Sequence, residues 1–443
     1  MKEPCIYCPG GSDYNTPKSY TGKEPAAARA IQHNYDPHGQ VSSRIEQLRA
    51  IGHDVDKIEL IIFGGTLTCY PRDYLEWFTT KCLNAISGSD ATTIAAAQAA
   101  AENATIRVSD IAFETRPDYC KEPHVDLLLD LGATRVELGV QTVHDDIYKI
   151  VKRGHTVEDV AEATRIARNA GFAVTYHMML GLVGSDIERD FEMFQELFAN
   201  QDFKPDALKI YPCLVLKNTK LYELWKSGEF EPITTSQAVE LLARVKPELP
   251  KWVRIQRIQR DIPANLIQAG VKTGDIRVLV RKKLEQNGAK CRCIRCREVG
   301  HVSLKNGTRP DLENVTLSVE KYRASMGEEI FLSFDDTKKD IILALLRLRI
   351  PSQLVHRPEI NTHTTLVREL HVYGQLVPVG LHPFEKSWQH RGLGSSLLAE
   401  AERISKEEYG AKKISVLSGI GTREYYFKRG YTRDGPYVSK TLS

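Results

Sequence analysis

The stretch IELIIF at residues 58–63, which runs directly into Gly64, Gly65 and Thr66, is an apolar segment of strand length that ends in turn residues. Further segments of this kind follow, with helical periodicity between them: SDIAFE (109–114), RVELGV (135–140), AVTYHMML (173–180), ALKIYP (207–212) and VRIQRI (253–258). Apolar strands that alternate with helices predict a parallel sheet linked by crossover helices. We therefore expect an α/β domain of the (β/α)6 type, a full or partial TIM-like barrel.

Polar residues stand where these predicted strands end. Glu114, Gln141 and Tyr211 each lie at or directly after a strand end, as Gly64 and Gly65 do. In parallel barrels the active site lies at the carboxyl ends of the strands. We expect one shared site there. The Ala-rich segment 91–101 predicts a surface helix, to which the sequence assigns no function.

The overall composition excludes several classes of protein. Of 443 residues, 42% are hydrophobic and 26% are charged, which is ordinary for a globular protein, and the length suggests two or three domains. There is no apolar run of about 18 residues, so we expect no membrane span. The start, MKEPCIYCPGG, lacks the blocks of a secretory signal, and we expect a cytoplasmic protein. In such a protein, nine cysteines indicate metal ligation rather than disulfides.

The composition changes near Leu284, where QNGAKCRCIRCREVGH (286–301) interrupts the alternation of strands and helices. After it, VTLSVEKYRASMGEEIFLSFDD (315–336) alternates like antiparallel strands, and DIILALLRLRI, RELHVYGQLVPVG and a helix over 392–409 follow. We therefore expect a barrel domain at 1–283, a Cys-rich junction at 284–310 and a mixed α+β domain at 311–443.

The junction carries Cys291, Cys293 and Cys296 in a C-x-C-x-x-C pattern, which favours zinc over three free thiols. A structural zinc site takes four ligands, and His301 and Cys120 are both candidates for the fourth. Arg292, Arg295 and Arg297 interleave the cysteines and could present a surface to RNA.

A second close pair, Cys5 and Cys8, brackets Ile6 and Tyr7 near the start of the chain. Alone, a C-x-x-C pair fits a redox pair, a zinc half-site or part of an iron–sulfur loop. In front of a parallel α/β series whose first strand ends in FGGT, the pair resembles the radical S-adenosylmethionine (SAM) enzymes.

The resemblance to one family of these enzymes, the catalytic subunit of the Elongator complex, covers nearly the whole chain. It rests on CIYCPGG, SYTGKEPAAARAI, IEQLRAIGHDVDKIELIIFGGT, ETRPDYC, RVELGVQT, RGHT, KIYP, RIQRDIP, CRCIRCREVG, ELHVYG, QHRGLG and GTREYYFKRGY. It implies that Cys5 and Cys8 hold a 4Fe–4S cluster with a third cysteine upstream. Since Met1 begins after that position, we expect an N-terminally truncated chain that has lost a preceding strand and holds the cluster poorly.

The same resemblance assigns roles in the barrel. It implies that Tyr7 lies near the adenine of SAM and that Gly64, Gly65 and Thr66 meet its methionine end, with Glu114 and Gln141 as further contacts. It makes His155, Lys209 and Tyr211 candidates for orienting the substrate.

In the second domain, QHRGLG contains Gln389, Gly392 and Gly394 in a Q-x-x-G-x-G loop that opens a helix, a pattern typical of pyrophosphate binding. With ELHVYG and LVPVG it resembles the GNAT acetyltransferases. That likeness implies that Glu369, Leu370, His371 and Val372 line acetyl-CoA and that Leu393, Gly394 and Ser395 contact its CoA part. Tyr426 matches the family's CoA-contacting tyrosine, beside Tyr425, which could equally be core, and Lys57 matches a lysine associated with acetyl-CoA.

The segment 251–297 carries 13 Lys and Arg residues against Asp261, Asp275 and Glu285, an excess that suits a nucleic acid. The family resemblance implies a tRNA partner, bound at its anticodon stem-loop and carboxymethylated at C5 of the wobble uridine by radical chemistry on acetyl-CoA. Two alternatives stay open, a GNAT protein lysine acetyltransferase with the barrel as a scaffold and a noncatalytic tRNA-binding subunit. Whether the chain forms a homodimer is also open.

Overall fold

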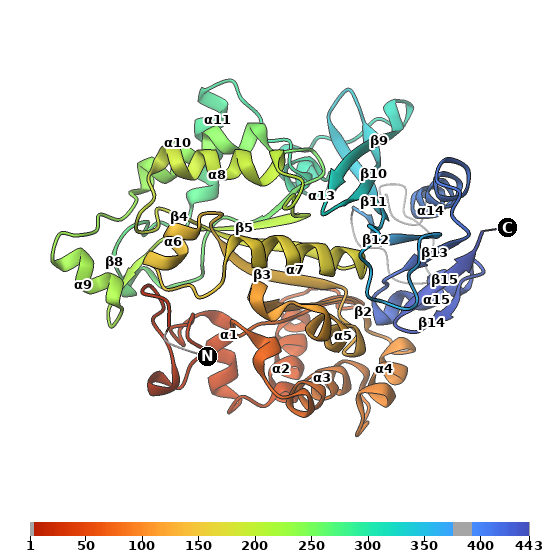
Figure 1. Cartoon of the computed structure of the whole chain (residues 1–443), viewed down its shortest axis with the longest axis horizontal. Coiled ribbons are helices and arrows are strands. Elements are labelled where there is room, and N and C mark those ends of the chain that lie inside the picture. The colour runs from red at the N-terminus through yellow and green to blue at the C-terminus, as the bar shows by residue number, and fades with distance from the viewer. Residues whose placement is uncertain (1–3, 375–391, 443) are drawn as a thin grey trace.

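A six-stranded parallel sheet forms the first half of the protein (Figure 1). The computed structural model describes residues 4–374 and 392–442. The strands stand in the order β1 (Lys57–Ile62), β2 (Arg107–Thr115), β3 (Arg135–Gln141), β4 (Ala173–Leu180), β5 (Ala207–Pro212) and β7 (Arg254–Arg257). All six predicted strands are confirmed. Within the described chain β1 and β7 are edge strands that do not pair with each other, so the barrel is partial.

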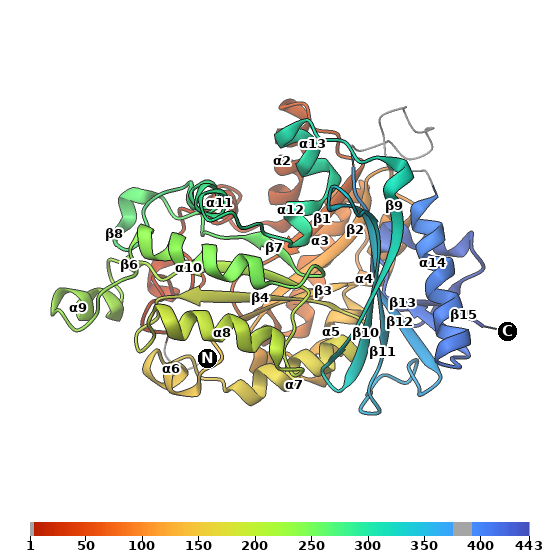
Figure 2. The same ribbon diagram turned by 90° about the horizontal axis from the view of Figure 1, so that it is seen from above.

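Helices connect these strands and cover the sheet (Figure 2). Several begin at side chains that cap free backbone N–H groups. Thr156 and Thr234 form capping boxes with Asp159 and Gln237, and Asp186 accepts from the Arg189 backbone. The helices are α1 (Pro25–Gln32), α2 (Pro37–Ala50), α3 (Arg72–Ser87), α4 (Ile94–Glu102), α5 (Glu122–Asp130), α6 (Asp145–Ile150), α7 (Val157–Asn169), α8 (Ile187–Ala199), α9 (Lys220–Lys226), α10 (Thr235–Glu248) and α11 (Ile276–Gln286). Two short strands, β6 (Val215–Leu216) and β8 (Ile267–Ala269), pair separately.

The second half is a seven-stranded mixed sheet in the order β14, β15, β13, β12, β11, β10, β9. Its strands are β9 (Val315–Ala324), β10 (Gly327–Asp336), β11 (Ile341–Ile350), β12 (Thr364–Val372), β13 (Lys413–Val416), β14 (Thr432–Asp434) and β15 (Tyr437–Thr441). Only β12 and β13 pair in parallel. The helices are α14 (Leu393–Arg403), which continues into a wider turn at Ile404–Glu408, and α15 (Arg423–Phe427). The predicted mixed α+β architecture is confirmed, and the LVPVG segment lies outside the described residues.

The junction between the two sheets is helical. It contains α12 (Ile294–Arg297) and α13 (Val299–Asn306). The Ile294 N–H donates to the Val253 carbonyl at 2.9 Å, and Glu298 forms a bridge to Ile342 of β11. The junction is therefore bonded to both sheets. The predicted boundary at residue 284 falls inside α11.

A buried network of charged residues holds the two halves together. Arg368 of β12 donates to both carboxylate oxygens of Asp206 at 2.8 Å and to Glu329 at 2.7 Å. Arg349 of β11 donates to Asn169 of α7 at 2.7 Å and to Glu329 at 2.8 Å. These side chains are almost fully buried, so each charge depends on its partner.

Close backbone contact and stacking complete this interface. A Cβ at Gly419 would lie 2.1 Å from the Ser109 carbonyl oxygen, and one at Gly421 would lie 2.5 Å from the Val108 nitrogen. Only glycine allows β2 and the second half to approach this closely. Trp252 stacks on Tyr322 with ring centroids 4.2 Å apart. Ion pairs, close backbone packing and ring stacking therefore join the two halves.

The Ala-rich segment forms the predicted helix, α4, but it is more than a surface element. Ala97 and Ala101 are fully buried. Glu102, at its end, accepts from Arg423 of α15 at 3.2 Å, so α4 helps to join the two halves. The described part of the chain contains no helix long and apolar enough to cross a membrane.

Candidate functional site

Cys5 and Cys8 lie close together in a loop that is fixed on both sides. The Ile6 N–H donates to the Val151 carbonyl at 3.2 Å, and the Leu221 N–H donates to the Ile6 carbonyl at 2.8 Å. The Arg153 guanidinium lies 3.8 Å from the Cys5 sulfur. A hydrogen bond from Cys8, assisted by the charge of Arg153, lowers the pKa of the Cys5 thiol to about 5 despite its burial. Cys5 is thereby prepared as a thiolate, the form that binds metals.

Other predicted residues surround this loop. The Tyr7 hydroxyl is buried and has no hydrogen-bond partner among the described residues, and burial raises its pKa. Gln141 ends β3 with a positive φ of 74°, and its amide nitrogen would lie 3.0 Å from a Cβ at Gly139. Arg153 also donates to the Gly139 carbonyl. Tyr7, Gln141 and Arg153 are therefore gathered around Cys5.

His155 lies deeper than its predicted substrate-orienting role requires. It is 4% exposed and packs edge-on against Tyr148 with ring centroids 4.5 Å apart. Burial, together with the charges of Arg153 and Arg116, lowers its pKa to about 2, so the ring is neutral. Both ring nitrogens are buried without a hydrogen-bond partner among the described residues, and the substrate-orienting role of His155 stays a prediction.

Glu114 is the centre of the strand-end site. Its carboxylate accepts from the backbone N–H groups of Gly64 and Gly65, both at 3.2 Å, and from the Tyr20 hydroxyl at 2.9 Å. Thr66, next in the chain, is buried. The carboxyl ends of β1 and β2 therefore converge, as the sequence predicted. Tyr20 was missed.

A second group of polar residues extends from Glu114 across the sheet. The sequence analysis named two of them, Lys209 and Tyr211, but not Glu137 or His177. His177 of β4 lies 3.6 Å from Glu114 and 3.0 Å from Glu137 of β3. Lys209 of β5 contacts Glu137, and Tyr211 packs edge-on against His177 with ring centroids 5.6 Å apart. Burial alone would raise the pKa of Glu137. The hydrogen bond from His177 and the charge of Lys209 outweigh burial and hold this pKa well below its usual range. Lys209 and Tyr211 thus join the predicted site through Glu137 and His177.

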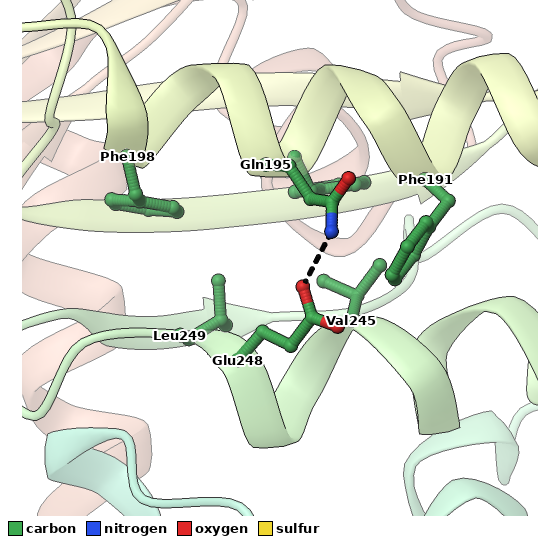
Figure 3. Close-up of a pocket in the computed structure, with 7 residues that line it drawn as sticks. Phe191, Gln195, Phe198, Val245, Glu248 and Leu249 are labelled. Atoms are coloured by element: carbon green, nitrogen blue, oxygen red, sulfur yellow. Dashed lines mark hydrogen bonds between the residues drawn. The ribbon is translucent and has the colours of Figure 1, made fainter.

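Two of the cavities in the described part of the chain lie in its first half. One, of about 310 Å³, is lined by residues 256–262 at the end of β7 and by 274, 276 and 277 at the start of α11. The other, of about 210 Å³, lies between α8 and α10 and is lined by Phe191, Phe194, Phe198 and their neighbours (Figure 3). In it Gln195 donates to Glu248 at 3.1 Å. It is formed by two helices and not by strand ends, and we assign it no role.

The glycine loop of the second half opens α14 as predicted. Gly392 caps the helix with φ 83°, and a Cβ at Gly394 would lie 3.2 Å from the Tyr425 hydroxyl and 3.4 Å from Val372. Ser395 accepts from Arg429 at 2.7 Å, and the Arg429 guanidinium stacks 3.6 Å from the centre of the Tyr425 ring. Leu393 begins the helix. Gln389 lies outside the described residues.

The two adjacent tyrosines occupy different places. Tyr426 is 6% exposed and packs inside the core of the mixed sheet. Tyr425 lies at the glycine loop, and its buried hydroxyl has no partner among the described residues. Tyr425 is therefore the tyrosine that lies at the glycine loop, and the contact of Tyr426 with CoA stays a prediction.

The segment Glu369–Val372 ends β12 beside the interface. Glu369 accepts from Arg347 at 2.7 Å, and this charge lowers its pKa against the opposing effect of burial. Leu370 and His371 follow, and His371 lies 4.2 Å from Tyr373, measured between ring centroids. Lys57 begins β1 opposite Arg107, which pairs with Glu424 of α15 at 3.6 Å. Lys57 is thus near the second half, and burial lowers its pKa.

The three junction cysteines do come together. The sulfur atoms of Cys291, Cys293 and Cys296 lie within 4.8 Å of one another. Neither His301 nor Cys120 belongs to this group, and His301 instead contacts Glu298 at 3.0 Å. The nearest cation is the buried ammonium of Lys246, 4.0 Å from the Cys296 sulfur. The donor set fits a soft metal ion held by three thiolates.

Much of the positive charge in segment 251–297 is neutralised within the protein. Arg254 pairs with Glu298, Arg297 with Asp335 and Asp340, and Lys283 with Glu240. Lys272, Lys282 and Lys290 are exposed and make no ion pair with a described residue. These three lysines are the charges most available to a polyanion.

The thiols of Cys5 and Cys8 are suitable ligands for a 4Fe–4S cluster, but the loop supplies only two of them. No third Cys, His, Asp or Glu of the described residues lies within 4.8 Å of both thiols. The orphaned hydroxyls of Tyr7 and Ser19 fit a polar ligand at the adjacent strand ends, since a Cβ at Gly65 would lie 3.5 Å from Ser19.

Comparison with known proteins agrees with this geometry. Residues 2–197 match the Radical SAM superfamily and residues 205–286 match the Radical_SAM C-terminal domain. Membership in this superfamily implies SAM and a 4Fe–4S cluster.

Relatives extend over the whole chain. A tRNA uridine(34) acetyltransferase of Methanocaldococcus jannaschii is 52% identical over 99% of this chain and 81% of its own length. Elongator complex protein 3 of Schizosaccharomyces pombe is 48% identical over 99% of this chain and 81% of its own length. The solved structure of Methanocaldococcus infernus Elp3 with an N-terminal deletion superposes with a TM-score of 0.90 at 51% identity, and covers 93% of this chain and 97% of that one. The protein belongs to the family of tRNA uridine(34) acetyltransferases and Elongator complex protein 3, within the radical SAM superfamily.

Proposed function

We propose that this protein modifies the wobble uridine of tRNA, using acetyl-CoA and radical chemistry to build a carboxymethyl group at C5. The observation that carries the proposal is that the strand-end site around Glu114 and the glycine loop of α14 lie in two halves that the buried Arg368–Asp206 ion pair joins. The relatives named for uridine(34) acetylation, similar over 99% of this chain, support it. They do not favour the lysine acetyltransferase or the noncatalytic alternative.

In the barrel, the chain's own residues would hold and orient SAM. The cluster and SAM, when bound, supply the radical. Tyr7 and Ser19 offer unpaired hydroxyls, and Gly64 and Gly65 allow close backbone approach. Glu114 is fixed between these glycines and Tyr20 and can accept from an ammonium group. His177, Glu137 and Lys209 form a fixed hydrogen-bonded row beside it.

In the second half, a GNAT-type domain would bind acetyl-CoA. No described side chain caps the N-terminus of α14, so its first backbone N–H groups could bind phosphates, and a Cβ at Gly392 would meet no described atom within 4 Å. The missing side chain of Gly394 instead lets Tyr425 and Val372 pack closely. Tyr425 offers an unpaired hydroxyl at this loop, and Arg429 fixes its ring. Glu369 to Val372 would line the acyl arm.

We further propose zinc at Cys291, Cys293 and Cys296 and a cytoplasmic location, where tRNA is available. The anticodon stem-loop would meet segment 251–297 through its exposed lysines.

Release of free thiol from acetyl-CoA, measured with and without tRNA, tests the proposal. We expect tRNA that carries uridine at position 34 to accelerate thiol release severalfold. Tyr425→Phe should reduce this acceleration. Lysine peptides that accelerate release in place of tRNA would overturn the proposal in favour of a protein acetyltransferase.

A further inference from the structure

The cavity of about 310 Å³ at the end of β7 has a polar and strongly basic lining. Arg257, Arg260 and Arg277 contribute to its wall against the single carboxylate of Asp261. Its volume lies near the lower limit of small-molecule sites, which suits one small planar group rather than a large ligand.

The cavity adjoins the strand-end site. Arg260 donates to the Ser19 carbonyl, lies 3.7 Å from Glu24 and stacks 5.4 Å from the centre of the Tyr20 ring. Tyr20 in turn donates to Glu114 at 2.9 Å. The charge of Arg260 also acts on Cys8, and that of Arg257 on Tyr211. A group bound in the cavity would therefore lie beside the residues gathered around Cys5 and Glu114.

The hydrogen-bonding capacity of the lining is asymmetric. The three guanidinium groups can only donate. Gln259 supplies an unsatisfied acceptor, because its amide oxygen is buried and accepts from no described residue. Arg257 pairs with Asp261 at 2.9 Å, but both side chains are about half exposed, so another anion can compete for this arginine.

Uracil matches this pattern. Its edge presents one N–H donor, at N3, between two carbonyl acceptors, and a ribonucleotide adds an anionic phosphate. Cytosine presents an acceptor at N3 and an amine at C4, so it offers one carbonyl to the arginines and no ring N–H to Gln259. Single-stranded RNA bases are read in this way, by their exposed edges.

We propose that this cavity receives the unstacked wobble uridine, with Gln259 accepting from N3–H and the surrounding arginines donating to its carbonyl and phosphate oxygens. The inference rests on the proposed function and adds the subsite that selects the base. Gln259 is then a specificity residue.

Binding of two anticodon stem-loop RNAs, identical except for uridine or cytosine at position 34, tests the assignment. Fluorescence anisotropy at one fixed salt concentration should show tighter binding of the uridine loop by on the order of tenfold, the discrimination typical of a specific base contact. Gln259→Leu should reduce this preference to about twofold or less and leave the cytosine loop almost unchanged. Gln268→Leu, in β8 and outside the cavity, is the matched control and should keep the preference.

A second measurement on the unaltered protein does not depend on the folding of any variant. A stem-loop with 4-thiouridine at position 34, irradiated and digested, should crosslink within residues 256–262 or 274–277. Crosslinks confined to other segments, or equal affinity for the two loops, would overturn the inference alone. Failure of every stem-loop to bind would overturn the proposed function and the inference with it.

Discussion

Glu137 is a buried carboxylate whose charge is balanced by His177 and Lys209, and it is 1% exposed. We expect Glu137→Gln to reduce the free energy of unfolding by about 3 kcal/mol, since it leaves the partly buried Lys209 without its counter-ion and removes the charged partner of His177. Urea denaturation followed by circular dichroism measures this. Glu188→Gln, at an exposed pair with Arg244, is the control and should change stability by less than about 0.5 kcal/mol.

The same residue gives a pH dependence. Because the folded-state pKa of Glu137 is lowered, its ionised form stabilises the protein above the unfolded pKa of about 4.3. That contribution is lost as pH falls through the lower folded-state pKa. The stability difference between the native protein and Glu137→Gln should therefore be constant from pH 6 to 8 and shrink below about pH 4. A difference that grows in acid would contradict the assigned ion pairs.

Variants of Tyr425 and Tyr426 should have different effects, the first on acetyl-CoA binding and the second on stability. Tyr425→Phe removes one hydroxyl at the glycine loop, and we expect the Kd for acetyl-CoA to rise about fivefold, as for one lost hydrogen bond, with an unchanged melting temperature. Tyr426→Ala removes a core ring and should lower the melting temperature by several degrees. Calorimetric titration and thermal unfolding of both variants measure this. The reverse pattern would restore Tyr426 as the CoA contact.

Residue roles could be predicted from sequence only where a motif fixes them. Glu114 and Gln141 were found because they end apolar strands. Glu137 and His177 were missed because their meeting depends on the register of β3 and β4, although His177 is a lone ionisable residue in an apolar strand, which is a usable signal. Adjacent tyrosines in the short helix α15 cannot be distinguished by periodicity, so tertiary packing alone decides which is buried.

At the scale of elements, buried arginines of β11 and β12 join the second sheet to α7 and to Asp206, directly before β5. Arg368→Met removes the guanidinium shared by Asp206 and Glu329, and we expect a loss of about 3 kcal/mol in the free energy of unfolding, because two buried carboxylates each lose one of their arginine partners. Arg403→Met, in an exposed cluster with Glu400 and Glu407, should cost less than about 1 kcal/mol. Equal losses in the two variants would show that the buried network contributes little.

Cys293 directly precedes the junction helix α12, and Cys296 lies within it, so a metal held by the three thiolates would anchor this helix. We expect the purified protein to contain about one zinc ion per chain, and Cys296→Ser to lose most of it and to unfold at a lower temperature. Elemental analysis and thermal unfolding measure this. A protein without zinc that is as stable as the zinc-loaded form would exclude a structural metal here.

The sequence was most informative about the helices and strands. All six parallel strands and the antiparallel pair within residues 315–336 were predicted, because alternation and turn residues are local signals. The connection of α4 to α15 through Glu102 and Arg423 was not, because a buried ion pair between distant segments has no local signature.

At the scale of the whole molecule, tRNA binding should respond to salt. Lys272, Lys282 and Lys290 are exposed in a basic segment, and replacing all three with alanine should reduce the slope of log K against log salt by about 2, if each contacts one phosphate. Anisotropy titrations at several salt concentrations measure this. Arg281→Ala, which removes a surface charge paired with Glu285, should change the slope by less than one unit. An unchanged slope in the triple variant would move the RNA to another face.

The glycines and arginines that join the two halves also have a consequence for the history of the chain. A substitution at Asp206, Gly419 or Arg368 disturbs contacts of both halves. A change in one half must therefore be matched by a change in the other. A half taken from a relative would have to bring matching residues at these positions, and a half produced alone would expose unpaired charge. The two halves are therefore expected to change together in evolution.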